Sequence, residues 1–84
     1  MPPTSIEQWF EAFDTLLNQM IDQQERKLLH LARQIVPDLT PEDLRNPQDF
    51  PQLDRDPQFN FEDGQLAGLR SAHIAVRAEL RRQS

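Results

Sequence analysis

Residues 5–36, SIEQWFEAFDTLLNQMIDQQERKLLHLARQIV, are the stretch that decides the fold. Apolar side chains recur in it every three or four residues, which is the period of an amphipathic helix. We predict one helix over 5–36, about 45 Å long at 1.5 Å per residue. Its stripe is formed by Ile6, Phe10, Phe13, Leu17, Met20, Ile21, Gln24, Leu28, Leu31 and Ile35.

Both ends of this helix are marked in the sequence. Thr4 precedes Glu7 by three residues, which is the spacing of a capping box, and Glu7 also suits the positive end of the helix dipole. Pro37 biases the residue before it away from helical geometry. We therefore expect Thr4 to cap the start and the helix to end at residue 36.

Composition limits the class of protein. The 84 residues allow a single helical domain over 1–84, and the absence of cysteine excludes disulfides. Neither a signal peptide nor an apolar stretch of membrane-spanning length is visible, so we expect a cytoplasmic protein without membrane contact. The net charge of −5 argues against a chain that binds nucleic acid as a whole.

Residues 37–60 are rich in proline and carry many acidic side chains. Thr40 followed by Pro41 predicts a short helix over about 41–45. Apolar residues recur through the segment, which favours an ordered strap lying against the helices over a partly mobile acidic linker. These apolar residues are Leu39, Leu44, Phe50, Leu53 and Phe59.

A second helix is predicted over about 61–82, with Asn60 as its N-cap. Its inward row has the same alternation of four- and three-residue steps as the first helix, which indicates an antiparallel hairpin with coiled-coil-like packing. The predicted pairs are Leu31 with Leu66, Leu28 with Leu69, Gln24 with His73, Ile21 with Val76 and Leu17 with Leu80. Gln24 and His73 would then form one polar layer in the seam.

Three surfaces remain as candidates for binding. In this register the second helix ends opposite about Phe13, so an aromatic end projects beyond it and needs cover from the strap or from another chain. This end comprises Ile6, Trp9, Phe10 and Phe13. A stripe of small residues on the second helix comprises Gly64, Gly68, Ser71, Ala72 and Ala75. A basic edge on the same helix comprises Arg70, Arg77 and Arg81.

No motif in the sequence indicates catalysis, a metal site or a cofactor. The only two histidines, His30 and His73, do not converge in the hairpin, and neither a phosphate loop nor a calcium loop is present. We therefore expect no enzyme and no cofactor.

These observations predict an all-α fold, an antiparallel hairpin of a long helix, a proline-rich strap and a second helix. A chain this short often needs a partner, so a homodimer forming a four-helix bundle is expected. The favoured function is a non-catalytic module for protein–protein interaction. The alternative is weak nucleic-acid binding through the basic edge.

Overall fold

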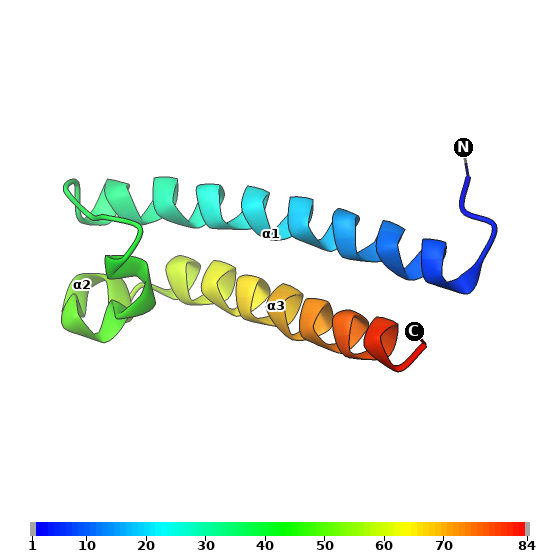
Figure 1. The fold of residues 1–84 in the computed structure, drawn as a ribbon. Coiled ribbons are helices and arrows are strands. Elements are labelled where there is room, and N and C mark those ends of the chain that lie inside the picture. Colours follow the sequence, from blue (N-terminus) through cyan, green and yellow to red (C-terminus); the bar gives the residue numbers. More distant parts are fainter. Residues whose placement is uncertain (1, 84) are drawn as a thin grey trace.

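The computed structural model describes residues 2–83. Two long helices, α1 (Ile6–Ile35) and α3 (Pro57–Gln83), pack antiparallel along most of their length (Figure 1). Between them lie two 3₁₀ turns, η1 (Asp43–Arg45) and η2 (Pro47–Asp49), and a short helix, α2 (Pro51–Asp54). The predicted all-α hairpin is confirmed.

The start of α1 lies one residue later than predicted. Ser5, and not Thr4, is the N-cap: its side-chain oxygen accepts the backbone N–H of Gln8 at 3.1 Å. The side-chain oxygen of Gln8 in turn accepts the N–H groups of Thr4 and Ser5, which completes a capping box. The helix ends at Ile35, before Val36 adopts the extended backbone that Pro37 favours.

The start of α3 lies four residues before the predicted one. The carboxylate of Asp56 accepts the backbone N–H of Phe59 at 2.8 Å, and Pro57 occupies the first helical position, where its missing N–H costs nothing. Asn60 is therefore already inside the helix, where its side chain donates to the carbonyl of Asp54 at 3.0 Å.

The strap packs against the helices. Leu39, Leu53 and Phe59 have at most 1% of their surface exposed, so the strap side of the molecule supplies much of the core. The predicted short helix at 41–45 is the 3₁₀ turn η1, where the side chains of Thr40 and Asp43 accept each other's backbone N–H groups.

The core lies at one end of the hairpin. Its buried apolar residues come from the second half of α1, the strap and the first half of α3, and they are Ile21, Leu28, Ala32, Leu39, Leu53, Phe59 and Leu66. Among the described residues, none before Ile21 is buried. The other end of the molecule is therefore a two-helix stalk with little core of its own.

The predicted register of the two helices is wrong. Gln24 does not meet His73: it hydrogen bonds to Glu62, while His73 contacts Asp14. These contacts set Glu62 and His73 opposite residues ten or eleven positions earlier in α1 than predicted, which is about three helical turns. Both rows still face each other after a slide of whole turns, because their side chains recur every three or four residues. The predicted register would also set the Glu62 carboxylate against Ile35, where it would lose its hydration without a partner.

Candidate protein-interaction face

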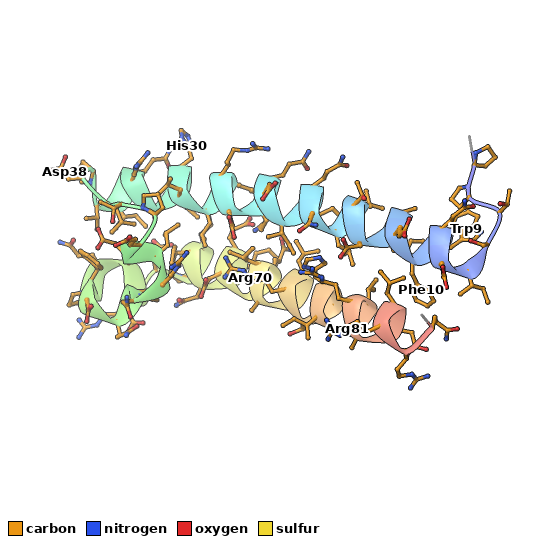
Figure 2. All side chains as sticks on the ribbon, in the orientation of Figure 1. Trp9, Phe10, His30, Asp38, Arg70 and Arg81 are labelled. Carbon is orange, nitrogen blue, oxygen red and sulfur yellow. The ribbon has the colours of Figure 1, made fainter. Side chains whose placement is uncertain are left out.

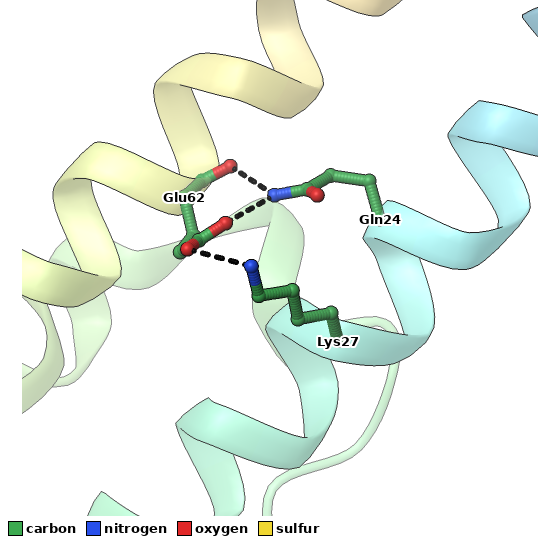
Figure 3. A network of polar contacts seen from close by, with 3 residues as sticks. All are labelled: Gln24, Lys27 and Glu62. Carbon is green, nitrogen blue, oxygen red and sulfur yellow. Dashed lines mark hydrogen bonds and ion pairs between the residues drawn. The ribbon is translucent and has the colours of Figure 1, made fainter.

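The best-buried polar group of the seam is Glu62, which is 6% exposed. The side-chain amide of Gln24 donates both to the Glu62 carboxylate at 2.7 Å and to its backbone carbonyl at 3.0 Å (Figure 3). The ammonium of Lys27 lies 3.0 Å from the other carboxylate oxygen. The Gln24 hydrogen bond, and after it the hydrogen bond and charge of Lys27, lower the pKa of Glu62 against the opposing effect of burial. The site is a structural lock between the helices.

A second polar contact holds the stalk. Nε2 of His73 lies 2.7 Å from Oδ1 of Asp14, and Nε of Arg77 lies 3.7 Å from the same oxygen. Both His73 and Asp14 are largely buried in the seam. Gln24 and His73 are thus both seam residues, as predicted, but each has a different partner.

The basic edge of α3 faces an acidic edge of α1. Arg70 pairs with Glu25 and Arg77 with Asp14, and the Arg70 side chain lies beside α1 (Figure 2). Arg81 lies on the same edge of α3, one turn beyond Arg77. Exposed pairs of this kind contribute little stability. They matter more for nucleic-acid binding, because arginine side chains that already pair with carboxylates of the same chain attract a phosphate less strongly.

The opposite face of the hairpin is apolar and open. Five large side chains of α1 follow each other at steps of three and four residues, and between 40% and 62% of the surface of each is exposed. We call this set the α1 stripe: Ile6, Trp9, Phe13, Leu16 and Met20. It faces away from the side of α1 that carries Asp14 and Glu25. The stripe extends further along the helix than the predicted aromatic end.

The predicted aromatic end does not project beyond α3, and the strap does not cover it. From Arg77, which pairs with Asp14, α3 continues to Gln83, which adds about 9 Å and brings its end level with the first turns of α1. Phe10 is half-buried and lies between the two helices (Figure 2). The neighbouring Trp9 and Phe13 rings contact each other, with centroids 5.9 Å apart, on the open side.

Small side chains of α3 border the same face. Met20 and Lys27 of α1 line a shallow groove together with Gly68 and Leu69 of α3, which places Gly68 on the side of the α1 stripe. By helical phase Ala72 and Ala75 lie beside Gly68. We call these three residues, Gly68, Ala72 and Ala75, the α3 small face. All are exposed, as are Gly64 and Ser71, which lie further round the helix.

No contact among residues 2–83 explains the glycines of α3. A Cβ atom added at Gly64 or Gly68 would meet nothing within 4 Å. Each glycine inside a helix costs about 0.5–1 kcal/mol relative to alanine. Neither glycine is therefore closely packed against another part of residues 2–83.

A separate groove lies on the charged face, between α1, the strap and α3. It encloses about 320 Å³ over a floor that includes Leu28, Leu44 and Leu66. Side chains of both charges also line it, among them Arg26, Arg45 and Asp63. Sequence reasoning missed this groove, because the strap residue Leu44 completes it and its position depends on how the strap folds back.

No group of three or more His, Asp or Glu side chains among residues 2–83 is arranged to hold a metal ion. His30 points away from α3 while His73 lies in the seam, so the two histidines are far apart (Figure 2). Over the same residues, neither long helix has an apolar run of the kind needed to cross a membrane. Comparisons of the chain with known protein families, with curated proteins and with solved structures found no match.

Proposed function

We propose that this protein is a non-catalytic module for protein–protein interaction that acts through its open apolar face. The observation that carries the proposal is the α1 stripe, five large side chains with about half of their surface exposed on one side of one helix. Scattered exposed apolar residues are ordinary, but a row at coiled-coil spacing is typical of a surface that another helix covers.

The shape of the chain supports this proposal. Its radius of gyration is 15.9 Å, against about 12 Å for a compact domain of this length. Its accessible surface is 6153 Å², against about 5,200 Å² for a compact monomer of 9.9 kDa. Covering the exposed half of each stripe side chain would contribute about 1 kcal/mol per residue. A partner helix would thus gain most of its binding energy from this stripe.

A paired comparison of variants tests the proposal. Leu16→Gln removes the middle of the α1 stripe. Ile74→Gln changes a side chain that is 67% exposed on the opposite side of the hairpin and serves as the matched control. We expect self-association, or capture of a specific protein from the native host, to be lost with Leu16→Gln and kept with Ile74→Gln. Binding that survives Leu16→Gln unchanged would refute the proposal.

The second candidate function is nucleic-acid binding through Arg70, Arg77 and Arg81. We favour it less, because Arg70 and Arg77 already pair with acidic residues of α1. We also propose a cytoplasmic location, with which the absence of cysteine is consistent. Cell fractionation of the tagged protein would test the location.

A further inference from the structure

We propose that the partner on the open face is a second copy of this chain, and that the α1 stripe of each copy lies on the α3 small face of the other. This inference rests on the proposed function, since it names the occupant of the same face. The inference also specifies the two-fold axis that relates the two copies, which runs parallel to the helices.

The first argument is that the two halves of the face match in position along the hairpin. The contacts Glu25–Arg70 and Asp14–Arg77 bracket the stretch of α1 that includes Leu16 and Met20, and the same contacts bracket the stretch of α3 that includes Ala72 and Ala75. The α1 stripe and the α3 small face therefore lie side by side at the same height along the stalk. A partner fits the α1 stripe and the α3 small face at once only if its own small and large side chains lie at matching heights along the helices. A second copy of the chain meets this condition.

The second argument is that large side chains on one helix should meet small side chains on the other. Two hairpins that meet face to face can be related by an axis along the helices or by an axis across them. The first places each α1 over the α3 of the other copy, so large side chains such as Leu16 meet glycine and alanine. The second places α1 over α1, so large side chains meet large ones and Gly68 and Ala72 face each other across a gap. Close packing favours the first arrangement.

The arrangement with the axis along the helices also gives Gly64 and Gly68 different roles. Gly68 lies level with the α1 stripe, where the space open around its missing Cβ would be filled by the other copy. Gly64 lies beyond the stripe, towards the strap. All neighbouring helices would then run antiparallel, as in a standard four-helix bundle.

Area and charge are consistent with a dimer. The chain exposes about 950 Å² more than a compact monomer of its mass, which is close to the roughly 800 Å² per partner of a standard interface. The charged groups at the two ends of the face, Lys27 and Glu79, already have partners in their own chain, Glu62 and Arg82. Docking would leave neither of them unpaired.

Disulfide cross-linking tests the arrangement, because the chain contains no cysteine that could interfere. Chains carrying Leu16→Cys and chains carrying Ala72→Cys, distinguished by a mass tag, are mixed and oxidised. We expect the mixed pair to cross-link several-fold more than either variant with itself. Ile74→Cys mixed with Leu16→Cys is the control and should not cross-link. Circular dichroism checks that each variant is folded, and sedimentation of the unmodified protein should give a species of twice 9.9 kDa.

The outcomes separate the two proposals. If Leu16→Cys, or a cysteine variant at Phe13 or Met20, cross-links with itself more than with Ala72→Cys, α1 lies over α1. This result would overturn the proposed arrangement. A monomer at high micromolar concentration, with no cross-link above the control, would overturn the dimer. If such a monomer still binds another protein through Leu16, the interaction module stands and only the identity of its partner is wrong.

Discussion

His73 and Asp14 meet at 2.7 Å although fifty-nine positions separate them in the chain. With the contact of Gln24 and Glu62, this pair fixes how far α3 slides along α1, because the apolar rows alone also face each other after a slide of whole helical turns. Polar partners in the seam therefore select one register among those that the leucine spacing allows.

The His73–Asp14 pair should show energetic coupling. We expect Asp14→Asn to destabilise the fold by about 1–2 kcal/mol, because it weakens a largely buried hydrogen bond to a basic group. The combined Asp14→Asn/His73→Gln variant should lose less than the two single variants together. Urea unfolding at one fixed protein concentration measures this. Glu79→Gln, in an exposed pair with Arg82, should change stability by less than about 0.5 kcal/mol. Strictly additive losses at Asp14 and His73 would show that the pair does not set the register.

Glu62 should make stability depend on pH in the acidic range. Its pKa is lowered in the folded state, so the unfolded chain takes up the proton first as the pH falls. The stabilisation is complete above the ordinary pKa of about 4.3 and is lost as the pH falls through the lowered folded-state pKa. We expect the stability gap between the unmodified protein and Glu62→Gln to narrow from about pH 6 to pH 3. Thermal unfolding across this range measures the gap, with the exposed-site variant Glu42→Gln measured in parallel as the control. A constant gap at Glu62 would contradict the prediction.

Phe59 should be critical for folding. It is fully buried where α3, α1 and the strap meet, so Phe59→Ala should cost about 3–5 kcal/mol. That loss approaches the whole stability of a small domain, and the variant should be largely unfolded at 37 °C. Far-ultraviolet circular dichroism would show it as lost helix signal. Ile74→Ala removes an exposed apolar side chain and should leave the signal unchanged. A well-folded Phe59→Ala variant would mean that the first turn of α3 contributes little to the core.

Gly64 offers a stabilising substitution. A Cβ atom at this position meets nothing within 4 Å, and the position lies inside a regular helix. We expect Gly64→Ala to raise the free energy of unfolding by about 0.5–1 kcal/mol through helix propensity alone. Thermal unfolding at a fixed concentration would show the rise. An unchanged or lower stability would indicate that another molecule needs the space at Gly64.

The basic edge should bind nucleic acid poorly. Because Arg70 and Arg77 pair with acidic residues of α1, we expect no binding of a labelled oligonucleotide below about 100 μM at low salt. Fluorescence anisotropy measures this. Tighter binding that falls steeply with added salt, and that Arg70→Gln weakens, would move nucleic acid to the leading function.

Helix number, order and direction could be predicted from periodicity, and the buried strap residues from their apolar character. The register could not, because side chains that recur every three or four residues face each other again after a slide of whole turns. Glu62 carried the missing signal: it stands in line with Leu66 and Leu69 but is charged, so it needed a polar partner in α1. The cap was ambiguous because Thr4–Glu7 and Ser5–Gln8 have the same spacing.

Only part of the candidate interaction face could be predicted, because the apolar pattern again allows more than one arrangement. The apolar stripe of α1 is broad, and the sequence does not say which of its edges meets α3. Met20 was therefore placed in the same stripe as the seam residues, although it lies on the open side with Leu16. The groove under Leu44 depends on the path of the strap, which no local pattern specifies.

The separation of the buried core from the exposed stripe has an evolutionary consequence. The buried core lies at the strap end, while the exposed side chains that we propose bind a partner lie at the stalk end. If the proposal is right, substitutions at these exposed positions would alter whom the protein binds, and how tightly, with little effect on whether it folds. Folding and recognition are thus free to diverge under selection, each through its own end of the hairpin.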